Sequence, residues 1–246
     1  MRVMIDISYD GSQFEGFASQ PHGRTVADNL GEVLNRIYKQ KVNLYGSSRT
    51  DSKVSAKTQY IVFDPPFEIK PDNIVRAINA IAPKSIYCKS AQLVADRYMP
   101  RHNVEYKTYK YTITSEYAPI YRHIEYYVRQ QLDVEKMQIG ANYLIGTHDF
   151  GSFCSANTDI EDKVRTITKL SVEAVNNRVV ITVSGDGFLY NMVRIIVGTL
   201  IEFGLGKADP HSMNQILEAK DRSKAYATAP AHGLMLEYIQ LEGQND

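Results

Sequence analysis

Apolar and polar residues follow two different periods along the first part of the chain. Residues 3–9 alternate with a period of two, which predicts a half-buried strand that ends at an Asp10-Gly11-Ser12 turn. After Thr25, a suitable N-cap, apolar residues recur at helical spacing. The other predicted elements are strands over 42–45, 59–63 and 85–94 and a helix that begins at Pro71. Together they give a β-α-β-β-α-β order, the ferredoxin-like unit.

The second part of the chain repeats this order. Asn176 and Asn177 separate two alternating runs, as is typical of a two-residue hairpin turn. The predicted strands cover 105–114, 125–129, 168–175, 179–183 and 234–241, and the predicted helices cover 133–145, 188–203 and a short segment after Pro210. Residues 146–150 are expected to lead from a helix into a loop. Two such units predict an α+β fold with antiparallel and mixed sheets, divided into domains 1–103 and 104–246 around a central cleft.

Composition places the chain among ordinary globular proteins. Of its 246 residues, 43% are hydrophobic and 23% are charged. Cys88 and Cys154 are too few for a disulfide scaffold and have no metal-ligand spacing, so we expect a cytoplasmic setting. The N-terminal strand pattern argues against a signal peptide, and the apolar run at 195–201 is too short to cross a membrane. The 28 basic residues balance the 28 acidic ones, which by itself argues against a nucleic-acid partner.

A polar loop at residues 46–55 separates two predicted strands and is the most informative segment. It holds one carboxylate, Asp51, two residues after Arg49. Loops on a rigid scaffold are where catalytic groups concentrate. From the local sequence alone, the favoured interpretation is an Asx turn, in which the Asp51 side chain bonds its own backbone.

An isolated charge in an apolar helix gives weight to a catalytic role for Asp51 against the Asx turn. Arg194 is the only charged residue between Gly187 and Ile201. An arginine in such a helix either extends to the surface, which is the commoner case, or meets a buried acid. If Arg194 is buried, Asp51 is a good candidate partner, and the cation would keep the carboxylate ionised, as a nucleophile requires.

Residues 97–123 interleave basic and aromatic side chains, with five Lys or Arg against two acids. The six tyrosines are Tyr98, Tyr106, Tyr109, Tyr111, Tyr117 and Tyr121. This composition suits phosphate contacts and base stacking, and it equally suits a tyrosine-rich sheet packed at an interface. On a strand, Lys107, Tyr109 and Tyr111 share one face and Lys110 lies on the other. Because local charge governs electrostatic binding, zero net charge does not exclude RNA.

The remaining polar motifs carry weaker signals. His148 is better explained as a structural hydrogen-bonding residue than as a metal ligand, since the six histidines show no zinc spacing. The glycines between 198 and 206 form no dinucleotide fingerprint, because no strand precedes them as that motif requires.

Seven blocks, in order along nearly the whole chain, match one known pattern. The most specific are Arg49-Thr50-Asp51, the strand segment 107–111 and the helix segment 188–198. The others are residues 9–17, 25–26, 148–153 and 229–234. Taken together, they resemble the tRNA pseudouridine synthase A family, in which these three segments carry the catalytic aspartate, a Tyr-x-Tyr strand and an arginine.

The residues around Asp51 depart from the family's usual Gly-Arg-Thr-Asp-Ala-Gly-Val-His-Ala-x-Gly-Gln. The differing residues are Ser48, Ser52, Lys53, Ser55 and Thr58, while Val54, Ala56 and Gln59 match. Phe17 also stands where the family usually has tryptophan. Lys53 replaces a glycine, so the loop would follow a different path if that glycine has a positive φ. Alternatively, Lys53 would add an RNA phosphate contact.

The resemblance implies isomerisation of uridine to pseudouridine on the 3′ side of the anticodon stem-loop of tRNA, with the target nucleotide flipped out. It assigns catalytic roles to Asp51 as nucleophile, to Arg194 as its partner and to Arg49 as the group that holds the nucleotide's place or phosphate. Substrate binding falls to Tyr109, Lys53, Lys107 and Lys110. The resemblance further implies no cofactor, no metal and no membrane, and a homodimer whose subunits together build the RNA-binding cleft.

Two alternatives stay open at this point. The altered residues beside Asp51, Lys53 above all, suggest an RNA-binding paralogue that has lost activity. A glycoside-bond hydrolase with Asp51 as nucleophile would need a second carboxylate about 5–10 Å away. Glu15 and Asp149 are candidates for that carboxylate, and free uracil would be a product.

Overall fold

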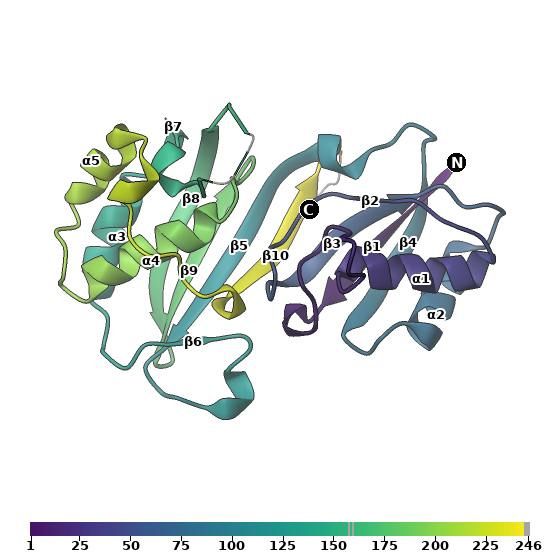
Figure 1. Cartoon of the computed structure of the whole chain (residues 1–246), viewed down its shortest axis with the longest axis horizontal. Helices are drawn as coiled ribbons and strands as arrows, with labels where there is room; N and C mark the ends of the chain where they lie inside the picture. Colours follow the sequence, from purple (N-terminus) through teal and green to yellow (C-terminus); the bar gives the residue numbers. More distant parts are fainter. Residues whose placement is uncertain (157, 159, 244–246) are drawn as a thin grey trace. The chain divides into compact units, whose positions relative to one another are not determined.

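The computed structural model describes residues 1–156, 158 and 160–243 and has an α+β fold. The chain packs as two units, which we call unit 1 (residues 1–105 and 236–246) and unit 2 (residues 106–235). This division places the C-terminal strand residues with the N-terminal part of the chain, whereas the predicted domains 1–103 and 104–246 assign them to the second domain. Each unit is described by itself below (Figure 1).

Unit 1 has the predicted β-α-β-β-α-β order. Its elements are β1 (Arg2–Tyr9), α1 (Val26–Tyr38), β2 (Leu44–Gly46), β3 (Ser55–Phe63), α2 (Pro71–Ile81) and β4 (Ile86–Val94). β1 pairs antiparallel with both β3 and β4, and β2 pairs with β3. Residues 236–241 of β10 (Leu234–Leu241) lie next to β3. The two helices lie against each other, and α2 packs on β4 (Figure 1).

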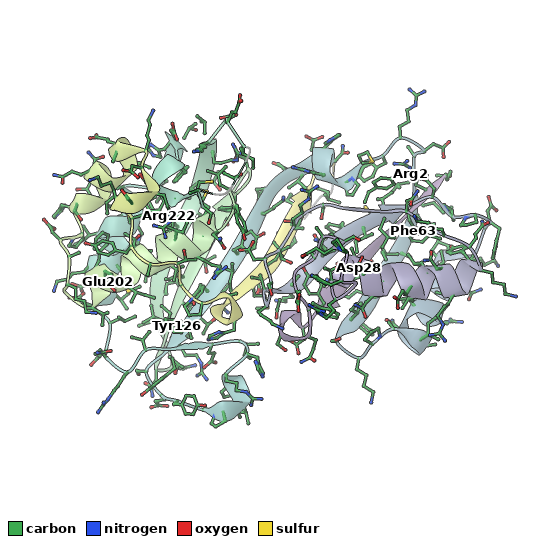
Figure 2. The ribbon with its side chains drawn as sticks, in the orientation of Figure 1. Arg2, Asp28, Phe63, Tyr126, Glu202 and Arg222 are labelled. Atoms are coloured by element: carbon green, nitrogen blue, oxygen red, sulfur yellow. The ribbon has the colours of Figure 1, made fainter. Side chains whose placement is uncertain are left out.

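Local chemistry accounts for the bounds of α1. The Thr25 hydroxyl accepts a hydrogen bond from the Asp28 backbone N–H at 3.2 Å and donates to the Asp28 carboxylate at 2.6 Å, which caps the first turn. Asp28 is labelled in Figure 2 at this end of the helix. Lys39, at a φ of 56°, ends α1 in the left-handed conformation. The helix buries Leu30 and Leu34 completely.

Unit 2 contains the remaining elements. They are most of β5 (Val104–Thr114), β6 (Tyr126–Tyr127), α3 (Val134–Asn142), β7 (Gly146–Asp149), β8 (Val164–Val175), β9 (Arg178–Gly185), α4 (Met192–Gly204) and α5 (Ser212–Ala219). The strand order is β5-β9-β8-β7, with β6 parallel to β5. α3 packs against both α4 and β8 (Figure 1). The predicted hairpin is confirmed, since Asn176 and Asn177 connect β8 to β9 at φ values of 46° and 62°.

Helix bounds in unit 2 differ from the predictions where a backbone turn intervenes. α4 begins at Met192 and not at Phe188, because Asn191 has a φ of 61° and cannot belong to a right-handed helix. α3 ends at Asn142 and not at residue 145, and Gly146 then turns the chain at a φ of 113°. Among the described residues, no helix combines the length and apolar character needed to cross a membrane.

Strand bounds differ where pairing with a distant strand decides the conformation. Residues 146–149, expected in a loop, form β7 because they pair with residues 164–167 of β8, which also lengthens β8 at its start. The predicted strand 125–129 shrinks to the two residues of β6. β3 begins at Ser55, four residues before its predicted start, since Ala56 pairs with Tyr9 of β1.

Candidate active site

The loop that carries Asp51 is anchored within unit 1 on both sides of the carboxylate. The Thr50 and Tyr9 hydroxyls are hydrogen-bonded at 2.7 Å, and the Thr50 carbonyl accepts the Phe17 N–H at 3.1 Å. On the other side, the Val54 N–H donates to the Asp51 carbonyl at 3.2 Å. Thr50 and Val54 are buried, whereas Asp51 is half-buried. These contacts fix the backbone on both sides of Asp51.

The Tyr-Asp-Gly turn after β1 packs directly against this loop, and two glycines make that approach possible. A Cβ on Gly11 would lie 2.1 Å from the Val54 carbonyl oxygen, so no larger residue fits there. Gly16 has a φ of 96°, and a Cβ on it would lie 3.2 Å from the Thr50 carbonyl oxygen. Residues 9–17 therefore lie directly against the Asp51 loop.

Lys53 occupies the position at which the family usually has glycine, and it adopts a conformation that favours glycine. Its φ is 67°, and its backbone N–H donates to the Phe14 carbonyl at 3.3 Å. Its ammonium group donates to the Ser12 carbonyl at 3.0 Å. The side chain is exposed, so the ammonium is at the surface beside the Asp51 loop.

Gln59, one of the residues that match the family pattern, is buried and supports the loop. Its side-chain amide donates to the Ser48 carbonyl at 2.7 Å, and its oxygen accepts from the Ser47 hydroxyl at 2.9 Å. Gln59 and Ser47 are both fully buried. A buried amide with both ends bonded fixes the start of the Ser48-Arg49-Thr50-Asp51 segment, while Arg49 itself is exposed.

In unit 2, Arg194 is held on α4 by neutral acceptors. Its Nε donates to the Ala229 carbonyl at 2.8 Å, and its Nη1 donates to the Asn191 side-chain oxygen at 2.6 Å. The Ala229 N–H donates in turn to the Arg194 carbonyl at 3.0 Å. A Cβ on Gly198 would lie 1.8 Å from the Ala227 carbonyl oxygen, so glycine is required for this close approach. These bonds orient the guanidinium.

Tyr109 and Tyr111 of β5 both point into the core of unit 2. Tyr109 is 7% exposed, and its ring meets the Phe188 ring edge-on, with 5.2 Å between centroids. The Tyr111 hydroxyl donates to the Pro230 carbonyl at 2.7 Å, and burial raises the pKa of this phenol. The sequence pattern places Tyr111 on a strand but does not indicate this bond to Pro230. Because Arg194 bonds Ala229, the tyrosine and the arginine anchor the same turn.

The tyrosines of the basic and aromatic stretch, residues 97–123, lie in two kinds of environment. Tyr109 and Tyr111 belong to the core, as expected of a sheet rich in tyrosine, whereas Tyr117 and Tyr121 are exposed. Lys107 and Lys110 are half-buried on β5, at positions that pair with Gly185 and Thr182 of β9. The buried pair agrees with a sheet rich in tyrosine, and RNA contact by this stretch stays a prediction.

The predicted site residues thus fall into two groups. Asp51, Arg49 and Lys53 share one loop of unit 1, and Tyr109, Lys107, Lys110 and Arg194 belong to β5 and α4 of unit 2. The pairing of Asp51 with Arg194 stays a prediction. His148 has the structural surroundings expected of it: its Nε2 is hydrogen-bonded to the Ile145 carbonyl oxygen at 3.0 Å, and its ring lies edge-on to Phe150.

Comparisons with known proteins agree with these blocks. A sequence model of the family described as tRNA pseudouridine synthase matches residues 141–240. The tRNA pseudouridine synthase A of Staphylococcus saprophyticus is 42% identical over 98% of this chain and 91% of its own length. Those of Brevibacillus brevis and Bacillus subtilis are 45% and 43% identical, each over 96% of this chain and 97% of the relative.

A solved structure titled Crystal Structure of a Cbf5-Nop10-Gar1 Complex aligns over 95% of this chain and 57% of its own at 11% identity, with a TM-score of 0.36. That similarity is too distant to bear on the site. The high identity to the three synthases extends over nearly the whole chain, and it shows that this chain belongs to the tRNA pseudouridine synthase A family.

Proposed function

We propose that this protein isomerises uridine to pseudouridine within the anticodon stem-loop of tRNA, with Asp51 as the nucleophile. The observation that carries the proposal is identity of 42–45% to tRNA pseudouridine synthases over 96–98% of the chain. The anchored loop around Asp51 supports it, because a nucleophile requires a fixed backbone and an accessible carboxylate.

The proposed reaction replaces the bond between ribose C1′ and uracil N1 with a bond between C1′ and uracil C5. The Asp51 carboxylate attacks either the sugar at C1′ or the uracil ring, and the bond between C1′ and N1 breaks. The uracil turns and rejoins C1′ through C5, and the bond to Asp51 breaks, which releases the carboxylate. C5 then loses its proton while N1 gains one. Substrate and product therefore have the same atoms, and the reaction as written consumes no oxidant and no second substrate.

The other residues bind and orient the flipped nucleotide. Extruding a base from the stack costs roughly a few kcal/mol, which stacking on an aromatic ring offsets in part. We assign stacking to Tyr109, whose ring Phe188 supports from the side. Arg194 acts beside Asp51, and exposed Arg49 holds the place or the phosphate of the nucleotide. Lys53, Lys107 and Lys110 contact RNA phosphates.

The direct test uses unmodified tRNA with tritium at C5 of its uridines, since only formation of the new bond at C5 releases this label. We expect release by the wild type, none by Asp51→Asn, and normal release by Asp72→Asn, which alters an exposed acid on α2. Tyr109→Phe keeps a ring for stacking and tests only a role of the hydroxyl in proton transfer. Release by Asp51→Asn at the wild-type rate would rule out the nucleophile assignment.

The same assay separates the alternatives. An inactive RNA-binding paralogue would bind tRNA with a steep salt dependence and release no tritium. Lys53 does not favour that outcome, because its backbone keeps a hydrogen bond to Phe14 within an anchored loop. A glycoside hydrolase would release free uracil. Of its candidate second carboxylates, Glu15 is bound by Arg24 at 2.8 Å and 3.0 Å.

A further inference from the structure

Asn191 immediately precedes α4 and has an unusual backbone conformation for that position. Its φ is 61° and its ψ is 7°, in the left-handed region. The residue before the first turn of a helix normally has an extended backbone, as Thr25 has before α1 and Asp133 has before α3. A residue other than glycine keeps the left-handed conformation at an energetic cost, which other contacts must offset.

The side chain of Asn191 is equally unusual, because it does not cap the helix. Asparagine is among the best capping residues, since its side-chain oxygen can accept a backbone N–H of the first turn. Thr25 and Asp133 each accept such a bond, at 3.2 Å and 3.0 Å. A residue type suited to capping therefore makes different contacts at the start of α4.

The Asn191 amide instead joins Arg194 to Ser155. Its oxygen accepts a hydrogen bond from Nη1 of Arg194 at 2.6 Å, and its Nδ2 donates to the Ser155 hydroxyl oxygen at 2.8 Å. The Ser155 N–H donates to the Tyr190 carbonyl at 3.1 Å, which ties the serine to the residue before the asparagine. Because a guanidinium has only donors, the amide oxygen faces Arg194 and the amide nitrogen faces Ser155. Both ends of the amide are bonded, so the side chain has one defined orientation.

The bond to Asn191 complements the one to Ala229. Arg194 is the third residue of α4, and in a capping box the side chain of that residue bonds back to the backbone of the capping residue. Here the Arg194 side chain bonds to the side chain of Asn191. The Ala229 carbonyl accepts from Nε at 2.8 Å, so two different nitrogens of the guanidinium are held by two different segments. Two bonds to one planar group fix its direction as well as its position.

We propose that Asn191 is a positioning residue for Arg194, and that Ser155 holds the Asn191 amide in the orientation which this role requires. The effect on turnover rests on the proposed function, because it acts through Arg194 beside Asp51. The left-handed backbone of Asn191 and its unused capping oxygen are the cost of orienting an arginine. Local strain that the surrounding structure maintains is typical of functional sites.

Asn191→Gly separates the backbone of this residue from its amide. Glycine adopts a φ of 61° without cost and is accepted before a helix, but it offers Arg194 no acceptor. In the tritium assay kcat should fall about 10- to 100-fold, because bonds to charged groups are strong, while KM changes less than about twofold. Tm should stay within about 3 °C of the wild type, since relief of the backbone offsets the lost bonds.

The matched control is Asn176→Gly. Asn176 is an exposed asparagine of unit 2 at a φ of 46°, in the turn between β8 and β9, and its replacement should leave kcat and Tm unchanged. The proposal is overturned if Asn191→Gly keeps the wild-type kcat. It is also overturned if the loss disappears when kcat is expressed per folded molecule.

Variants of Ser155 test the second step, and they carry the test if Asn191→Gly does not fold. Ser155→Ala removes the acceptor of the Asn191 amide and should lower kcat about 3- to 10-fold, whereas Ser155→Thr keeps a hydroxyl and should stay within about twofold of the wild type. Because Ser155 acts through Asn191, adding Ser155→Ala to Asn191→Gly should lower kcat no further. Fully additive losses would contradict this arrangement.

A readout without turnover distinguishes this inference from the proposed function. The heteronuclear ¹⁵N NOE of the Arg194 Nε–H, assigned by its absence in Arg194→Lys, reports how rigidly the guanidinium is held. It should fall in Asn191→Gly and not in Asn176→Gly. If the wild type releases no tritium from tRNA but the NOE falls as expected, the proposed function fails and the positioning of Arg194 stands. An unchanged NOE in Asn191→Gly overturns the inference even if the wild type is active.

Discussion

Lys53 combines an unfavourable backbone conformation with an exposed ammonium group, so Lys53→Gly should change stability and RNA binding in opposite directions. A φ of 67° costs an L-residue roughly 1 kcal/mol relative to glycine. The substitution also removes the bond from Nζ to the Ser12 carbonyl at 3.0 Å, a surface interaction worth about 0.5 kcal/mol. We therefore expect a net stabilisation of about 0.5 kcal/mol, or a rise in Tm of about 1–2 °C.

Binding of tRNA should weaken in the same variant, because the loop that carries Asp51 loses a positive charge. Each lost phosphate contact lowers the dependence of log Kd on log salt concentration by about one unit of slope. Filter binding at several salt concentrations measures this slope, and differential scanning calorimetry measures the change in Tm. A kinetic assay under subsaturating tRNA should show the loss in kcat/KM.

Lys39→Gly is the matched control. Lys39 is also an exposed lysine of unit 1 at positive φ, but it ends helix α1. Its replacement relieves the same backbone conformation and removes the same charge, so it should raise Tm and leave the salt slope unchanged. The reasoning is refuted if Lys53→Gly lowers Tm, or if it binds tRNA with the wild-type affinity and salt slope.

Three further variants test contacts within unit 2. Gly198→Ala should cost at least about 3 kcal/mol in urea unfolding and abolish turnover, since its Cβ would lie 1.8 Å from the Ala227 carbonyl oxygen. Tyr111→Phe should cost about 1–3 kcal/mol by leaving the Pro230 carbonyl without its donor, and it should lower kcat more than it changes KM. His232 has a pKa below 6.5 in the folded state, so the unfolded state binds more protons and wild-type stability falls as pH drops through about 6.5. His232→Gln should lose less stability between about pH 7.5 and 5.5, and an identical loss would contradict this linkage.

The parts of the fold that depend on residues close together in the sequence were predictable from it. Thr25 caps α1 through an atom three residues away, so the pattern of hydroxyl and apolar residues suffices to place the helix start. Asn176 and Asn177 adopt positive φ because their own short side chains tolerate it, and the hairpin follows. In the candidate site, the Asp51 loop was recognisable because its motif is contiguous.

Elements defined by distant partners were not predictable in this way. Residues 146–149 form a strand because β8 is available to pair with them, and their own sequence does not reveal that partner. Phe188 resembles the first residue of an apolar helix but instead supports the Tyr109 ring of another element. Apolar periodicity reports that a residue is buried, and it does not report against which element.

Arg194 shows why the same limit applies to function. The sequence pattern marks it as an exceptional charge in an apolar helix that either extends to the surface or meets a buried acid. The pattern does not reveal that the Ala229 carbonyl accepts a hydrogen bond from Arg194, because that contact depends on Gly198 letting the chain approach α4. The Ala229 carbonyl and the Asn191 side-chain oxygen each accept a hydrogen bond from the guanidinium, and these two bonds help to fix its direction. The orientation of Arg194 is therefore a property of the 227–233 segment, and substitutions there should impair catalysis without touching the arginine.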